Sequence, residues 1–179
     1  MPQKAVSPEN LDRYKADFES FDSDAIISDL YLKFLVTELK PYIDSNYRTR
    51  TDRQNTFVMG SSMGGLISAY AITEYPEIFG GAGCVSTHFP LGDGAIVEYL
   101  SNKLPDPSTH KIYWDYGTET LDHNYEAYQK LMDSHGYAAG YVEGENWMSR
   151  KFEGHEHSER AWRARVHIPL IFLLGKEGR

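Results

Sequence analysis

The sequence predicts an α/β fold in which a mostly parallel sheet carries helices on its faces. Short apolar runs typical of strands alternate with longer segments whose apolar residues recur at helical spacing. The 179 residues are 41% apolar and 25% charged, which is enough for a folded domain without disulfides or structural metals. The expected architecture is therefore one sheet-centred unit.

The first part of the chain is expected to be an irregular, polar lead-in over residues 1–23. Residues 24–179 are expected to form a single domain. Apolar residues at helical spacing predict a first helix over about 24–40, and Pro41 disturbs it because proline lacks the backbone N–H. A turn-like exit over 42–49 should follow.

The middle of the chain alternates clearly between strand and helix. A β-type run at 55–60 ends in glycine, a helix is expected at 63–75 before Pro76, and a second short strand is expected at 82–86. The remaining predicted elements are a strand at 111–116 ended by Gly117, a helix at 124–135 ended by Gly136, β-like segments at 137–143 and 150–153, and a last helix at 158–174 kinked at Pro169.

Composition excludes several classes of function. The net charge is −8 and no basic run occurs, which argues against nucleic-acid binding. The single cysteine, Cys84, permits no intrachain disulfide and no cysteine-rich zinc site. No apolar stretch is long enough to span a membrane, so no membrane association is expected. The N-terminus shows no signal-peptide pattern, so the default localisation is cytoplasmic.

The most informative motif is Gly60-Ser-Ser-Met-Gly64, which matches G-x-S-x-G between a predicted strand and a predicted helix. This turn is sharp, and side chains two residues before and after its centre are expected to collide. Centring the motif on Ser61 would put methionines where small residues are needed. Ser62 is therefore the candidate nucleophile, and the backbone N–H of Met63 is the candidate oxyanion donor.

A serine hydroxyl needs a general base. In this architecture the partners follow in the order serine, acid, histidine, and His157 lies in a predicted loop just before the last helix. His155 is the competitor, and we prefer His157 because it lies closer to the helix. A metal site built from His155, His157 and Glu159 would need a further ligand, so neither a metal nor a cofactor is expected.

The acid is expected in the loop after the strand at 111–116. Glu119 and Asp122 are both candidates to orient His157, and Glu119 is slightly preferred. Whichever of the two residues is not the acid is expected to cap the following helix. Asp115 lies inside the strand and is expected to be structural.

The elbow region GSSMGGLISAYAITEYPEIFGGAGCVS resembles that of the esterase D-like α/β hydrolases, which include enterochelin (siderophore) esterase-like and feruloyl esterase-like enzymes. The segments IYWDYGTETLD and FEGHEHSERAWRARVHIPLIFLLG resemble the family's acid and histidine regions, and the resemblance covers roughly residues 24–175. It implies Ser62 as nucleophile and His157 as base. Members commonly carry Asp where this chain has Thr120, which leaves the acid between Glu119 and Asp122.

An α/β hydrolase has several strands before its elbow, at about 30 residues per βαβ unit. The sequence before Ser62 offers no convincing strand other than 55–60. We therefore expect the chain to be the C-terminal portion of such a domain, with the N-terminal strands missing. A missing half would leave an open sheet edge that favours association, including homo-oligomers.

Three functions are compatible with these motifs. The first is a serine esterase that forms an acyl-enzyme with a small-molecule ester of siderophore, acyl-sugar or feruloyl type. The second is an inactive remnant or interaction module, and the third is an acyltransferase with the same triad. His88 and Phe89, which follow the strand at 82–86, are candidate substrate-binding residues.

Overall fold

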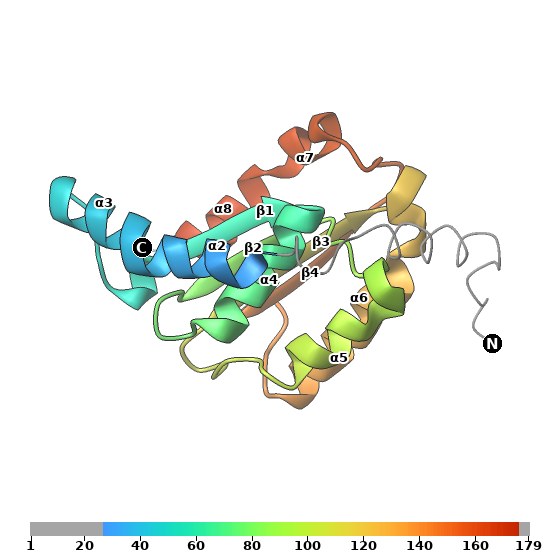
Figure 1. Cartoon of the computed structure of the whole chain (residues 1–179). Helices are drawn as coiled ribbons and strands as arrows, with labels where there is room; N and C mark the ends of the chain where they lie inside the picture. Colours follow the sequence, from blue (N-terminus) through green and yellow to red (C-terminus); the bar gives the residue numbers. More distant parts are fainter. Residues whose placement is uncertain (1–26, 176–179) are drawn as a thin grey trace.

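The computed structural model describes residues 27–175. The predicted lead-in over 1–23 and the predicted start of the first helix at residue 24 lie outside the described residues. Figure 1 shows a central twisted sheet with helices on both faces and one long helical segment beside it.

The sheet has four parallel strands in the order β1-β2-β3-β4, which confirms the predicted parallel α/β class. Their bounds are β1 Phe57–Ser61, β2 Gly81–Val85, β3 Lys111–Gly117 and β4 Trp147–Phe152. β2 is buried along its whole length, because it pairs on both sides and helices cover its faces. β1 and β4 are the edge strands within the described part of the chain.

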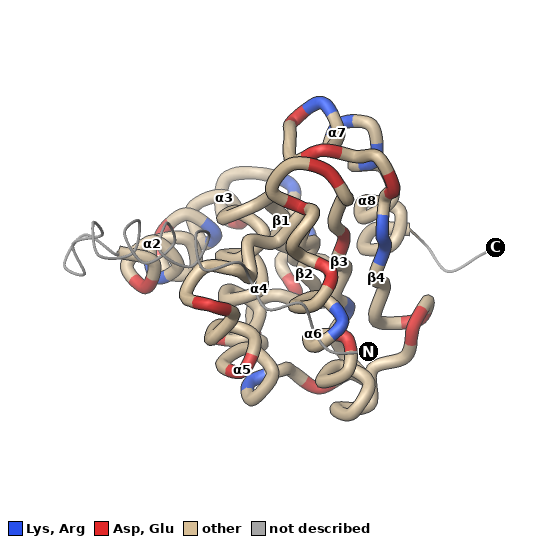
Figure 2. Tube along the Cα trace, turned by 90° about the vertical axis from the view of Figure 1, so that its right-hand side faces the viewer, with Lys and Arg blue, Asp and Glu red and all other residues tan. Residues whose placement is uncertain are grey.

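Helices cover the sheet from two sides, as the two perpendicular views in Figures 1 and 2 show. On one side, α4 (Met63–Glu74) packs on β1 and β2, while α5 (Ala95–Ser101) packs on α6 (Glu126–Ala138). On the other side, α8 (His167–Leu174) contacts β2 and β3, and α7 (Glu159–Arg165) precedes it. None of the helices between residues 27 and 175 is long and apolar enough to cross a membrane.

The core lies between the sheet and these helices. Its largest fully buried members are aromatic: Trp114 and Trp147 pack against one another with ring centroids 5.5 Å apart. Cys84 is completely buried among apolar neighbours, as expected for a small hydrophobic side chain. These side chains hold β2, β3 and β4 in the register that places their carboxyl ends together.

The first helix is longer than predicted, and its end at Lys40 was wrong. It runs as α2 (Ser28–Phe34), a π-helical segment η2 (Leu35–Leu39) and α3 (Lys40–Asn46), so most of the predicted turn at 42–49 is helical. Pro41 falls in the first turn of α3, directly after the wider π-helical turn. We attribute the tolerance of Pro41 to this wider turn. In it, the missing N–H of proline does not break a regular α-helical hydrogen bond, and the proline ring does not clash with the carbonyl group four residues earlier.

Two other predicted boundaries were also wrong. α6 continues through Gly136, where an added Cβ would lie 2.8 Å from the Trp147 ring, so this glycine permits close packing. Residues 137–143 are therefore not a strand. The last helix breaks at Val166 between α7 and α8, because Pro169 lies in the first turn of α8, where its missing N–H is harmless. The remaining short elements are η3 (Arg53–Asn55), η4 (Leu91–Gly94) and η5 (Thr120–Asn124).

Candidate active site

Ser62 lies in a strained turn between β1 and α4. Its backbone has φ 57° and ψ −119°, a conformation that residues other than glycine rarely adopt. The turn is held by its own hydrogen bonds: Ser62 N donates to Val85 O at 2.8 Å, and Ser62 O accepts from Leu66 N at 3.1 Å. The surrounding structure thus forces the serine out of the strand and into the space above the sheet.

Only one of the two motif glycines occupies a position that has no room for a side chain. A Cβ at Gly60 would lie 2.5 Å from the Gly64 carbonyl oxygen, which is a collision with backbone. A Cβ at Gly64 would meet nothing within 4 Å, so the predicted collision on that side was wrong. The strand must approach α4 at Gly60, whereas the helical side of the turn is open.

The structure brings Ser62, His157 and Asp122 together from three loops that follow β1, β4 and β3. His157 Nε2 lies 2.8 Å from Ser62 Oγ, and His157 Nδ1 lies 2.5 Å from Asp122 Oδ1. The His157 side chain is 10% exposed and that of Asp122 is fully buried. The carboxyl ends of parallel strands share one edge of the sheet, which is why residues 95 positions apart in sequence can meet.

Asp122 is held as a carboxylate by its hydrogen bonds. Burial alone would raise its pKa, but the hydrogen bonds from His157, Ser86 and the Gly117 N–H outweigh burial, and the pKa of Asp122 is lowered. An ionised Asp122 stabilises a positive charge on the adjacent imidazole. It also selects the tautomer in which Nδ1 carries the proton, leaving Nε2 free to accept one.

The slight preference for Glu119 as the partner of the histidine is corrected by this geometry. The Glu119 side chain is exposed and accepts a 3.4 Å hydrogen bond from Thr118, its neighbour in sequence. The turn of η5 carries Asp122 inward and leaves Glu119 outside. Thr120, which has φ 54°, contributes differently: its hydroxyl accepts a 2.8 Å hydrogen bond from His157 N.

The histidine loop is tied to the loop after β3 by backbone contacts. The His155 carbonyl accepts hydrogen bonds from the N–H groups of Thr118 and Glu119, both at 3.0 Å. The Thr118 hydroxyl accepts from Gly154 N at 2.8 Å. His155 therefore supports the loop, and His157 is the histidine of this loop that reaches Ser62. Among residues 27–175, no group of three or more histidine, cysteine or acidic side chains is arranged to hold a metal ion.

A buried polar cluster lies beneath His157, and no motif in the sequence predicted it. The Ser86 hydroxyl donates to Asp122 Oδ2 at 2.6 Å and accepts from Trp162 Nε1 at 3.0 Å and from Arg165 Nη2 at 2.7 Å. Arg165 is 2% exposed and pairs with Asp115 Oδ1 at 3.0 Å. One buried cation thus lies between two buried carboxylates, and Asp115 has the structural place expected of it.

Aromatic rings border the histidine on two sides. The Trp162 ring meets His157 edge-on at a centroid distance of 4.9 Å, and the Tyr125 ring does so at 5.8 Å. Neither residue was recognised from the sequence, since isolated aromatic residues give no signal of a site. Their rings restrict the orientation of the imidazole.

The two predicted substrate-binding residues have different surroundings. His88 Nδ1 lies 2.5 Å from the Tyr125 hydroxyl, and His88 N contacts the Ser62 carbonyl at 3.3 Å, so His88 borders the site. Burial, together with the nearby His157, lowers the pKa of His88 and favours its neutral form. Phe89 is 1% exposed and packs on Trp114, so its expected place at a substrate-binding rim was wrong.

Met63 is the first residue of α4, and the N–H groups of a helix's first turn have no partner within the helix. The helix dipole also concentrates positive potential there. The Met63 N–H is thus placed beside Ser62 and belongs to a helix terminus suited to a negatively charged oxygen. The Met63 side chain is 50% exposed.

The parallel sheet, the strained serine at the strand-to-helix turn and the loop-borne histidine define the α/β-hydrolase class of fold. The chain belongs to the esterase family, whose model (Putative esterase) matches residues 1–168.

Solved structures support this fold. The enterobactin esterase FES from Shigella flexneri matches with a TM-score of 0.67 at 21% identity, over 80% of this chain and 38% of that one. A ferulic acid esterase matches with a TM-score of 0.64 at 19% identity, over 80% of this chain and 60% of that one. Uncharacterized protein YbbA of Bacillus subtilis (strain 168) is 30% identical over 89 residues, which are 50% of this chain and 35% of the relative. The chain thus spans only part of the length of these relatives.

We predict that the two motif glycines differ in their effect on stability. Gly60→Ala should lower the free energy of unfolding by about 1–3 kcal/mol, because its Cβ overlaps backbone that cannot move aside. Gly64→Ala is the matched control and should be neutral or stabilise by up to about 1 kcal/mol, since alanine favours helix. Urea unfolding of both variants measures this. Equal losses would contradict the asymmetry.

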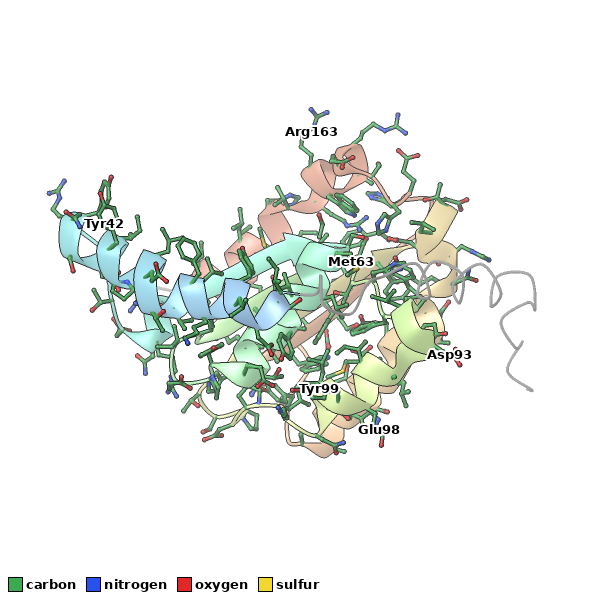
Figure 3. All side chains as sticks on the ribbon, viewed as in Figure 1. Tyr42, Met63, Asp93, Glu98, Tyr99 and Arg163 are labelled. Atoms are coloured by element: carbon green, nitrogen blue, oxygen red, sulfur yellow. The ribbon has the colours of Figure 1, made fainter. Side chains whose placement is uncertain are left out.

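We also predict that the buried cation is essential to stability. Arg165→Met leaves Asp115 and Asp122 buried without their cation, and should cost about 3–5 kcal/mol of unfolding free energy. Arg163→Met, in the same helix, is the control, because Figure 3 shows Arg163 pointing away from the protein. Its effect should stay within about 0.5 kcal/mol. Comparable losses in both variants would show that the cluster is not the cause.

Proposed function

We propose that this chain is a serine carboxylic ester hydrolase in which Ser62 is the nucleophile, His157 the general base and Asp122 the acid. The observation that carries the proposal is the continuous chain of contacts from Ser62 Oγ to His157 Nε2 at 2.8 Å and from His157 Nδ1 to Asp122 Oδ1 at 2.5 Å. Membership of the esterase family supports it.

In the proposed first step, Ser62 Oγ attacks the ester carbonyl carbon while His157 Nε2 takes the hydroxyl proton. The carbonyl oxygen becomes an oxyanion, and the Met63 N–H at the start of α4 is the donor that the described residues offer it. The imidazolium lies between ionised Asp122 and the aromatic edges of Tyr125 and Trp162, which keep it oriented.

In the second step, His157 gives its proton to the leaving alcohol, the ester C–O bond breaks, and an acyl group remains on Ser62. Water then attacks the acyl carbonyl with His157 again as base, and release of the acid restores the Ser62 hydroxyl. His88 borders this region in its neutral form, so it adds no positive charge that would oppose protonation of His157.

For substrate class, we propose a small-molecule ester. Two solved structures with this fold are named for enterobactin and for ferulic acid. Their sequence identities to this chain, 21% and 19%, are too low to infer that the chain acts on the same substrates. The substrate chemistry of this chain must therefore come from its own residues.

The nucleophile is tested by covalent labelling. A fluorophosphonate probe should add to the wild-type protein at Ser62, located by peptide mass spectrometry, and the protein should hydrolyse p-nitrophenyl acetate. Ser62→Ala should lose both properties, while Ser61→Ala, the neighbouring serine, should keep them. A folded wild-type protein that neither reacts nor hydrolyses any ester would refute the proposal.

The acid is tested by a pair of isosteric variants. Asp122→Asn should lower kcat by about 10²–10⁴, because an amide can neither fix the tautomer nor stabilise the imidazolium. Glu119→Gln should change kcat by less than about threefold, as its side chain is exposed and is hydrogen-bonded to Thr118. The opposite ranking would restore Glu119 as the acid.

The same pair has a readout independent of activity. Because the pKa of Asp122 is lowered by folding, its contribution to stability is present above the unfolded pKa and is lost as pH falls through the folded value. The acid-induced loss of unfolding free energy should therefore be smaller in Asp122→Asn than in the wild type. Glu119→Gln, which also removes one carboxyl group, is the control.

A further inference from the structure

A cavity of about 360 Å³ lies on the side of α4 that faces away from the sheet. We call it the α4 cavity. Its lining includes Met63, Leu66, Ile67 and Tyr70 of α4, Asp29 of α2 and Ile96 of α5. The volume falls within the range of small-molecule sites, whose walls are mostly apolar with a few polar groups.

The α4 cavity begins at the residue that follows Ser62. Met63 contributes its N–H to the candidate oxyanion position and its half-exposed side chain to the cavity wall. Figure 3 shows Met63 at the N-terminal end of α4. Met63 thus links the two places: its backbone N–H lies beside Ser62, and its side chain lies in the wall of the cavity.

The wall of the cavity follows one face of the helix. Positions 63, 66, 67 and 70 recur at helical spacing, whereas Ser68, Ala69 and Ile72 are buried on the face toward the sheet. From Met63 to Tyr70 the helix rises about 10 Å, which gives the cavity length as well as width. An extended apolar group can lie along this face.

The polar groups lie at the far end from Ser62. The Tyr70 hydroxyl donates to Asp29 Oδ1 at 2.6 Å, so its donor is already used. Burial, reinforced by this hydrogen bond, raises the pKa of Tyr70, so the ring stays neutral. The carboxylate of Asp29 is exposed beside it and would repel an acyl chain that ends in a second carboxylate.

We propose that the α4 cavity receives the acyl group of the substrate, and that this group is an uncharged, apolar chain longer than acetyl. The inference rests on the proposed function, because it assigns the acyl side of the same site. It narrows the substrate class to esters of neutral, apolar carboxylic acids and makes Ile96 a specificity-determining residue.

The kinetic test uses p-nitrophenyl acetate, butyrate, hexanoate and octanoate. In the wild type, kcat/KM should rise by up to about fourfold for each methylene that becomes buried. Ile96→Trp should lower the ratio of kcat/KM for octanoate to kcat/KM for acetate by about tenfold or more. Ile96→Ala, which enlarges the cavity, should keep the preference for longer chains.

Two controls separate the cavity from general effects. Leu131→Trp adds the same ring at an exposed position on α6 and should leave the chain-length preference unchanged. Thermal unfolding shows whether Ile96→Trp is folded; if it is not, Ile67→Phe takes its place as the filling variant. A preference for acetate, or a long-chain preference that survives a folded filling variant, would overturn the inference while leaving the esterase proposal intact.

A binding measurement distinguishes failure of the cavity from failure of the catalysis. Calorimetry should detect 1-octanol binding to Ser62→Ala, with a negative heat-capacity change that marks apolar burial, and the filling variant in the same background should abolish it. If no ester is hydrolysed, the proposed function fails. The binding measurement alone then shows whether the α4 cavity binds an apolar chain. Absence of binding to Ser62→Ala would overturn the inference.

Discussion

The hydrogen-bonded cluster at Ser86 is the interaction on which the arrangement of the site depends. Its hydroxyl joins Asp122 from the loop after β3 to Trp162 and Arg165 from α7, at distances between 2.6 and 3.0 Å. Ser86 itself directly follows β2 and has φ 41°, a conformation that turns the chain at the carboxyl edge of the sheet. Three elements far apart in sequence are therefore fixed relative to one another by one buried oxygen.

This cluster also explains why two buried carboxylates are tolerated. Burial disfavours the charged form of each carboxylate, and nearby hydrogen bonds and the Arg165 cation oppose that effect. Burial prevails at Asp115, whose pKa is raised, whereas the hydrogen bonds prevail at Asp122, whose pKa is lowered. Arg165 supplies the charge to Asp115 directly and lies 3.9 Å from Asp122, which Ser86 bridges. Asp122 can then remain ionised where it contacts His157. The electrostatics of the site are thus built beneath it, in the core, and not at its surface.

α4 connects the contacts at Ser62 to the α4 cavity. One face of the helix packs on β1 and β2, its N-terminus adjoins Ser62, and its outer face forms the wall of the α4 cavity. A single helix therefore sets the positions of the proposed nucleophile, the proposed oxyanion donor and the cavity proposed for the acyl group. Because these features share one helix, their relative placement does not depend on mobile loops.

Local patterns predicted the order of elements well and their ends poorly. Alternating apolar runs indicated β1 to β3 and α4 within one or two residues, since both periodicity and glycine placement act locally. The helix boundaries predicted from three residues were wrong, because the effect of a proline or glycine on a helix depends on what surrounds it. These residues are Pro41, Gly136 and Pro169. A π-helical turn accommodates Pro41, and the Trp147 ring requires Gly136.

The sequence by itself determined the parallel α/β class and the strand-to-helix turn at Ser62, and it indicated His157 as the histidine that meets Ser62, because the motif and its order along the chain carry that information. Only the tertiary structure showed that Asp122, and not Glu119, contacts His157, that Phe89 is buried, and that Arg165, Trp162 and Tyr125 lie around or beneath His157. These choices depend on which side chain a short loop turns inward and on contacts between distant elements. The spacing of residues along the chain predicts neither the side chain that a loop turns inward nor the contacts between distant elements. Both depend on how the carboxyl ends of the strands converge at one edge of the sheet.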